Sequence, residues 1–164
     1  MSSDKAERRS QHFEVSSGDL AGLDALGAEA LAVFCWSDVR PLRGVAGFLD
    51  WRLCGALSRA LQSGDFAAEA GELMLLPSNG RLGRRRLFVF GLGPIAQVDS
   101  EGLRRVSRRA AEVVRRAGAD KVAFAAPKGP HGSEIEETFL RVIESEFQND
   151  AELIHVVLME NAHR

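Results

Sequence analysis

The stretch from residue 85 to residue 116 constrains the fold more than any other part of the chain. An apolar segment, Leu87 to Phe90, passes into the glycine turn Gly91 to Pro94. A long amphipathic segment follows, in which apolar residues recur every three or four positions. A buried strand, a turn and a returning helix form the central unit of an α/β domain, and turns of this kind often hold ligands. Whether this turn holds one is the first functional question that the sequence raises.

Further apolar segments of strand length and amphipathic segments of helix length are spaced along the chain. The Asn79-Gly80 pair between two strands predicts a hairpin, whereas the strand–helix–strand order elsewhere predicts parallel neighbours. We therefore expect an α/β fold, a three-layer α/β/α sandwich around a mixed, mostly parallel six-stranded sheet. Strands are expected at residues 12–15, 30–36, 72–77, 84–90, 121–126 and 151–159, with helices at 47–62, 99–117 and 133–147 and one helical turn at 19–26.

Several helix ends carry local signals. Asp99 or Ser100 is suited to begin a helix that ends near Gly118. Ser133 and Glu136 have the spacing of a capping box, which predicts a helix start at residue 133.

The length of 164 residues fits one domain, which we expect to span residues 11–164 behind a disordered tail at residues 1–10. A net charge of -2 gives no general attraction to nucleic acid or to a membrane surface. The tail lacks the apolar core of a secretory signal, and no apolar run approaches the ~20 residues of a membrane span. A cytoplasmic location is therefore expected.

Cys35 and Cys54 both lie in apolar surroundings and form no Cys-x-x-Cys pair. We interpret both as small buried hydrophobic residues, which suits a reducing compartment. Trp51 falls off the apolar face of the helix expected at residues 47–62. We expect it to make a half-buried contact within the domain, and a contact with another chain is the alternative.

The turn after Phe90 has the pattern Gly-x-Gly-x-x-Ala at residues 91–96. A dinucleotide site of this pattern requires the helix to begin inside it, so that free N–H groups meet the pyrophosphate. Here the helix begins several residues later, and Pro94 has no N–H to donate. A nicotinamide site is therefore not expected. A phosphate nest formed by Gly91 and Gly93 is the alternative to a simple tight turn.

The helix expected at residues 99–117 carries a basic face. Arg104 and Arg108 lie one helical turn apart, as do Arg105 and Arg109. Residues 133–152 hold seven acidic residues and a single basic one. We interpret the basic face as solvated and partly paired with acidic residues within or between chains. Nucleic-acid binding is the alternative, although no aromatic interleaving supports it.

No catalytic or metal-binding pattern is present in the sequence. The four histidines, His12, His131, His155 and His163, share no spacing typical of metal ligands. Nucleophile and nucleotide-loop motifs are also absent from the sequence. We therefore predict no catalytic residue, metal or cofactor, and no enzymatic activity.

An ordered set of segments resembles the N-terminal domain of the leucine (cytosol) aminopeptidases, over about residues 12–159. It consists of a helix-ending segment from Leu53 to Phe66, then Ala70-Gly71-Glu72, a strand, basic residues, and the strand and turn from Leu87 to Gly93. The resemblance implies a macro-domain-like fold and a part in building a hexamer, and some bacterial members use this domain in DNA binding. The family's catalysis resides in a separate two-metal domain, whose Asn-Thr-Asp-Ala-Glu-Gly-Arg segment is absent from this sequence.

We therefore expect a non-catalytic, standalone homologue of that domain, acting as an interaction, assembly or regulatory module through a protein partner or self-association. The alternative is a macro-like binder of a nucleotide or an ADP-ribose-type ligand, since macro domains bind ADP-ribose. Their ligand motifs are not matched, and Gly44-Val45-Ala46-Gly47 is only weakly similar to one such loop. The candidate ligand residues are Arg40, Gly44, Gly47, Gly91 and Gly93.

Overall fold

A computed structural model describes residues 13–129, 133–148 and 154–159. The expected tail at residues 1–10 lies outside the described residues, as do His12, His131 and His163 and the side chain of His155. The strands are β1 (Phe13–Ser17), β2 (Ala30–Cys35), β3 (Leu73–Leu76), β4 (Arg81–Arg84), β5 (Arg86–Gly91), β6 (Lys121–Ala125) and β7 (Ile154–Met159). The helices are α2 (Leu20–Ala25), α3 (Gly44–Arg52), α4 (Ala56–Ser63), the 3-10 turn η1 (Ile95–Gln97), α5 (Ser100–Arg116) and α6 (Ser133–Phe147).

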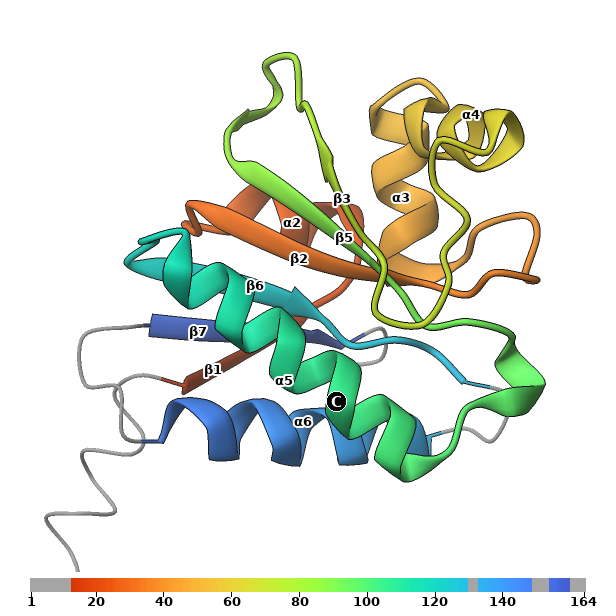
Figure 1. Ribbon diagram of the computed structural model, residues 1–164. Helices are drawn as coiled ribbons and strands as arrows, with labels where there is room; N and C mark the ends of the chain where they lie inside the picture. Colours follow the sequence, from red (N-terminus) through yellow and green to blue (C-terminus); the bar gives the residue numbers. More distant parts are fainter. Residues whose placement is uncertain (1–12, 130–132, 149–153, 160–164) are drawn as a thin grey trace, which may run out of the picture.

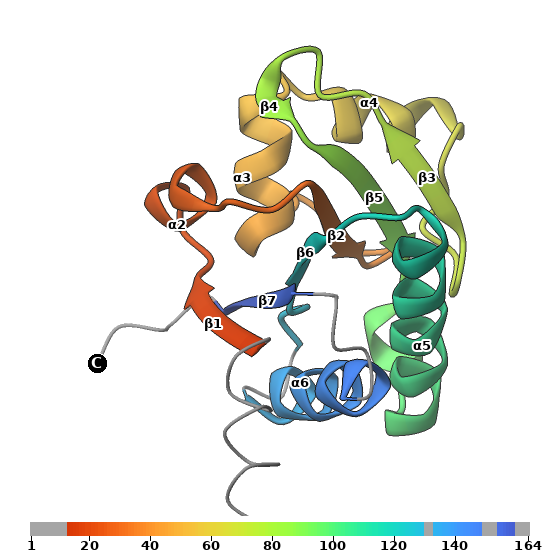
Figure 2. The same ribbon diagram turned by 90° about the vertical axis from the view of Figure 1, so that its left-hand side faces the viewer.

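Six of the described strands, all except β4, form a mixed sheet between two helical layers. Its order is β1-β7-β6-β2-β5-β3, and each neighbouring pair is parallel except the antiparallel pair β3 and β5. Helices α5 and α6 cover one face, while α2, α3 and α4 lie on the other (Figures 1 and 2). The predicted sandwich of mostly parallel strands is therefore confirmed.

The predicted hairpin between β3 and β5 is also present. Its tip turns at Asn79 and Gly80, which both have positive φ angles, 48° and 77°. The amide of Arg81 donates to the carbonyl oxygen of Ser78 at 2.9 Å, which closes the turn. The Asn-Gly pair thus acts where the sequence predicted it, because both residue types tolerate the left-handed backbone region.

Strand β2 lies at the centre of the core, and all six of its residues are buried. Leu31 and Val33 contribute to the apolar cluster under α3 and α4, while Ala32 and Phe34 contribute to the cluster under α5 and α6. A strand buried on both faces has no polar face to alternate, which explains its continuous apolar sequence.

The prediction of one helix at residues 47–62 is wrong, because the chain breaks there into α3 and α4. Cys54 and Gly55 adopt positive φ angles of 54° and 79°, which no α-helix continues through. The carboxylate of Asp50 accepts hydrogen bonds from the amides of Leu57 and Ser58 at 2.9 and 3.0 Å. Asp50, which belongs to α3, therefore caps α4. The prediction failed because the apolar residues of both helices keep a helical spacing across the break.

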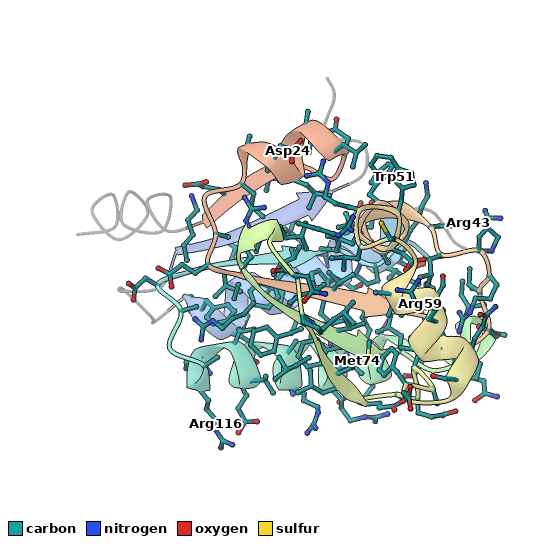
Figure 3. All side chains as sticks on the ribbon, turned by 90° about the horizontal axis from the view of Figure 1, so that it is seen from above. Asp24, Arg43, Trp51, Arg59, Met74 and Arg116 are labelled. Atoms are coloured by element: carbon teal, nitrogen blue, oxygen red, sulfur yellow. The ribbon has the colours of Figure 1, made fainter. Side chains whose placement is uncertain are left out.

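Two predictions of burial near this break are wrong. Cys35 is buried as expected, but Cys54 is exposed at the turn, where its sulfur accepts a hydrogen bond from Arg81 at 2.9 Å. Trp51 is 71% exposed and lies at the molecular surface (Figure 3). Because α3 ends at Arg52 and the chain turns toward α4, nothing among the described residues covers the outer side of that last turn.

The predicted helix ends around the central unit are confirmed. Asp99 is the N-cap of α5, and its carboxylate accepts from the amide of Gly102 at 2.6 Å. Gly118 has a φ of 64° and follows the end of α5. Helix α6 begins at Ser133 as predicted, although the side chain of Ser133 lies outside the described residues. Within the described part of the chain, no helix is long and apolar enough to cross a membrane.

Candidate functional site

A cleft of about 350 Å³ opens at the edge of the sheet where the parallel strands β2 and β6 end. Ligand sites of open α/β sheets lie outside the carboxyl ends of the strands, so this is the expected place for one. The cleft is bounded by the loop after β2, the start of α3, the start of η1 and the loop after β6. Its lining consists of Phe34, Cys35, Trp36, Val39, Leu42, Arg43, Gly44, Val45, Ala46, Ile95, Ala125, Ala126, Pro127, Lys128 and Gly129.

The N-terminus of α3 forms one end of the cleft. Its first residues, Gly44, Val45 and Ala46, all line the cleft. The N-cap residue, Arg43, has an extended backbone and makes no side-chain cap hydrogen bond. The first amides of a helix have no partner inside the helix, and the helix dipole places partial positive charge there. This end of the cleft therefore suits a negatively charged group.

Charged side chains in the cleft have one sign. Arg43 and Lys128 line it, and none of its described lining residues is acidic. Two cations and a helix N-terminus that line one cleft attract an anion from water, and the apolar walls reduce the screening of that attraction. The electrostatics thus favour an anionic ligand with an apolar part.

The walls of the cleft are held by contacts across the sheet. The indole N–H of Trp36 donates to the backbone oxygen of Lys128 at 2.9 Å, so the loops after β2 and β6 are joined directly. Phe34 packs edge-on against Phe139 of α6, with ring centroids 4.9 Å apart. These contacts hold the apolar wall in place, as expected of a pre-formed site.

Cys35 lines the cleft at the end of β2, and the residue is buried in the apolar core. Burial raises the pKa of its thiol to about 12. The thiol is therefore neutral over the physiological pH range and acts as a small apolar group rather than a nucleophile.

The loop residue Arg40, predicted to contact a ligand, points back onto its own loop. Its guanidinium group donates to the carbonyl oxygens of Trp36 at 3.0 Å and Val39 at 2.7 Å. It is not part of the cleft lining. Arg40 therefore stabilises the shape of the loop after β2, while the neighbouring Arg43 supplies the charge in the cleft.

Gly44 and Gly47, also predicted from sequence, have different roles. Gly44 lines the cleft and has a φ of 58°. Gly47 lies outside the lining, and a Cβ atom there would come within 2.6 Å of the carbonyl oxygen of Leu42. Gly47 thus permits the close approach of α3 to the preceding loop.

Gly91 and Gly93 lie outside the cleft, and their amides already have acceptors. The amide of Gly91 donates to the oxygen of Glu72 at 2.8 Å, and that of Gly93 to the oxygen of Ala68 at 2.9 Å. A Cβ atom at Gly91 would lie 2.1 Å from the oxygen of Glu69. A phosphate nest needs free amides, so these two glycines serve close packing of the turn against residues 68–72.

Of the five residues predicted to bind a ligand, Gly44 is the one that the structure places in the cleft. Three further lining residues, Trp36, Arg43 and Lys128, were not among those predicted. The position of Lys128 soon after β6 was a usable signal, because the ends of neighbouring parallel strands meet at one edge. The cleft role of Arg43 had no comparable signal in the sequence.

The basic face of α5 is partly paired within the chain, as interpreted from sequence. Arg108 contacts Glu146 of α6 at 3.1 Å, and Arg104 lies 3.6 Å from Glu101. Arg105 and Arg109 are exposed. Among the described residues, no group of three His, Cys, Asp or Glu side chains is arranged to hold a metal ion.

Comparison with known proteins shows the family of the chain. Residues 31–150 match the model described as cytosol aminopeptidase family, N-terminal domain. A probable cytosol aminopeptidase of Syntrophotalea carbinolica is 27% identical over 119 residues, which make up 73% of this chain and 24% of the relative. The chain therefore spans about a quarter of that relative's length.

Several solved structures with a similar fold are macrodomains. The macro domain of ganglioside induced differentiation associated protein 2 superposes with a TM-score of 0.71 at 13% identity, covering 93% of this chain and 78% of that one. The Trypanosoma brucei macrodomain, solved in complex with ADP-ribose, gives a TM-score of 0.67 at 15% identity, covering 92% of this chain and 65% of that one. These likenesses show a macrodomain-like fold.

Proposed function

Because the chain belongs to the cytosol aminopeptidase family, through a match to its N-terminal domain, we propose that this domain is non-catalytic and binds a small anionic ligand of the nucleotide type. The observation that carries the proposal is the cleft at the ends of β2 and β6, where the N-terminus of α3 meets Arg43 and Lys128. A cytoplasmic location stays a prediction from the sequence.

A nucleotide-type ligand matches the chemistry of the cleft. Its phosphate groups would accept hydrogen bonds from the first amides of α3, beside the guanidinium of Arg43. Its ring system would lie against the apolar wall that includes Phe34 and Val39. The Trypanosoma brucei macrodomain, which has a similar fold, was solved in complex with ADP-ribose, and this makes ADP-ribose and ADP the first ligands to test.

Isothermal titration calorimetry with ADP-ribose and ADP tests the proposal. We expect saturable binding with a Kd below about 1 mM, because a pre-formed cleft of this size buries most of such a ligand. Absence of heat at millimolar concentrations of both ligands would overturn the proposal.

A matched pair of variants locates the binding site. Ala126→Trp places a large side chain into the cleft, and we expect it to weaken binding about tenfold or more. Ala21→Trp makes the same change at an exposed position of α2, outside the cleft lining, and should leave the affinity unchanged. Equal losses in both variants would show that binding occurs elsewhere.

Assembly is a second candidate function, and the exposure of Trp51 is the observation that favours it. Tryptophan is enriched among the residues that dominate protein interfaces, and this one is 71% exposed. Sedimentation velocity over a range of concentrations should show self-association that Trp51→Gln abolishes. Leu75→Gln, at a position 64% exposed on β3, is the matched control and should not change it. A wild-type protein that stays monomeric throughout would contradict self-association.

A further inference from the structure

A second concave site lies in the other helical layer, between α5 and α6. These two helices pack side by side on one face of the sheet (Figure 1). The groove between them has a volume of about 230 Å³. Arg104 and Arg108 of α5 line it together with Thr138, Arg141, Ser145 and Glu146 of α6. Three guanidinium groups thus converge on one groove from two helices.

The acidic partners of these arginines leave much of their hydrogen-bonding capacity unused. Arg108 donates through Nε to Glu146 at 3.1 Å. Arg104 lies 3.6 Å from Glu101, and Arg141 lies 3.6 Å from Glu137. These two distances are too long for a hydrogen bond, and both pairs are solvent-exposed, so each contributes little to stability.

Donors therefore exceed acceptors in the groove. Each guanidinium group carries several N–H donors in a planar fork and has no acceptor. In the described part of the chain, the bond from Arg108 to Glu146 is the one hydrogen bond that these three guanidinium groups make. Thr138 and Ser145 add hydroxyl groups, and Glu146 is the one carboxylate in the lining. The lining thus has more hydrogen-bond donors than acceptor oxygens. Glu101 and Glu137 lie outside it, each 3.6 Å from one of the arginines.

We propose that this groove binds a phosphate monoester. Such a group carries nearly two negative charges at neutral pH and three acceptor oxygens, which complements the three guanidinium groups and their unused donors. A guanidinium group can bind two phosphate oxygens at once. The single carboxylate of the lining does not occupy all the N–H donors of the three guanidinium groups. The monoester belongs either to a phosphorylated side chain of a protein or to a free small molecule, and the groove recognises the chemistry that the two share.

The site is independent of the cleft proposed above. The groove and the cleft share no lining residue. Failure of ADP-ribose to bind the cleft therefore leaves this proposal standing, and the reverse also holds.

A titration followed by NMR tests the proposal. The probes are inorganic phosphate, a serine phosphopeptide and its unphosphorylated form, each at constant ionic strength. We expect saturable shifts of the Nε–H signals of Arg104, Arg108 and Arg141, and none with the unphosphorylated peptide. Phosphopeptide binding at least about tenfold tighter than phosphate binding identifies a protein source, whereas similar affinities identify a free phosphate compound. Shifts that do not saturate, or that spread over all exposed arginines, would overturn the proposal.

Two variants change the affinity in opposite directions. Arg108→Gln should weaken phosphate binding about threefold or more, because it removes one fork from the groove. Glu146→Gln should strengthen binding about threefold, because it removes the one carboxylate of the lining. A gain of affinity cannot result from misfolding. Arg116→Gln is the control and should have no effect, because Arg116 lies at the end of α5, outside the groove. Equal responses in the three variants would contradict the site.

Discussion

Two glycine-containing turns lie at the ends of neighbouring parallel strands, and they differ in what surrounds them. Strands β2 and β5 pair in parallel and end at the same edge of the sheet. The turn at the end of β5, with Gly91 and Gly93, is packed against residues 68–72, and both glycine amides donate to backbone oxygens. The loop after β2 leads to Gly44, where α3 begins with its first residues lining the cleft.

The difference shows that a glycine pattern reports backbone freedom and not a ligand. Gly91 is needed because there is no space for a side chain at its position. Gly44 has a positive φ and is the first residue of α3, at the end that lines the cleft. What separates the two turns is the partner of each amide, since an amide that already has an acceptor cannot bind a phosphate. The turn with the more familiar spacing is the one that lacks free amides.

The largest expected effect is on the packed turn. In Gly91→Ala the new Cβ atom would lie 2.1 Å from the oxygen of Glu69, so the backbone has to move. We expect a loss of about 3 kcal/mol in the free energy of unfolding, measured by urea denaturation. Gly64→Ala is the matched control, because its φ is 80° but no atom lies within 4 Å of the new Cβ. Its cost should be about 1 kcal/mol from backbone strain alone. Equal losses of stability in the two variants would mean that the turn at the end of β5 has room for a Cβ atom at Gly91.

The second effect concerns Cys35, which lies between the two turns. Its backbone oxygen accepts from the amide of Leu92, and the residue lines the cleft with its side chain buried. Burial raises the pKa of the thiol from 9.0 to about 12, so the unfolded chain loses this proton at a lower pH than the folded protein. The free energy of unfolding should therefore fall as the pH rises above 9, by about 1.4 kcal/mol between pH 8 and pH 10.

Other groups also titrate in this range, so the measurement is a difference between two proteins. Cys54→Ser serves as the background, because it removes the exposed thiol. Adding Cys35→Ala should remove the contribution of about 1.4 kcal/mol from the pH dependence, whatever the variant does to stability at pH 8. An unchanged slope would show that the thiol at the end of β2 is accessible to water.

Most of the fold was predictable, because strong local patterns agreed with the tertiary structure. The apolar run of β2, the Asn79-Gly80 turn and the cap at Asp99 each specify one local conformation, and each is present in the structure. The break between α3 and α4 was not predictable from periodicity. Apolar residues continue across it, and it depends on a cap that Asp50 supplies from seven and eight residues away.

The candidate site was predictable only in part. The edge of the sheet and the start of α3 follow from strand order and from Gly44. The orientation of the arginines does not follow, because Arg40 and Arg43 lie in one loop and a side-chain rotation decides which one faces the cleft. The amide partners of Gly91 and Gly93 are distant in sequence, so spacing alone could not show that these amides are occupied.

The third prediction concerns the contact that joins the two turns. The carboxylate of Asp38, in the loop after β2, accepts from the amide of Ile95 after β5 at 2.9 Å. Asp38→Ala leaves that amide without this acceptor, and we expect a loss of about 1 kcal/mol in the free energy of unfolding. Asp38→Asn keeps an acceptor oxygen and should lose less. If the two variants are equally stable, the contact does not hold the turns together.

The smallest expected effect distinguishes charge from shape in the cleft. Arg43 is exposed at its rim, so solvent screens its attraction for an anion. Arg43→Gln should raise the Kd for ADP about threefold, while Arg43→Lys, which keeps the charge, should change it less. Because the effect is electrostatic, the difference between Gln and wild type should shrink as the salt concentration rises from about 0.05 to 0.5 M. A difference that persists at high salt would show that Arg43 makes a direct hydrogen bond with the phosphate. The loop after β2 would then differ from the turn at the end of β5 through this side chain as well as through the amides of α3.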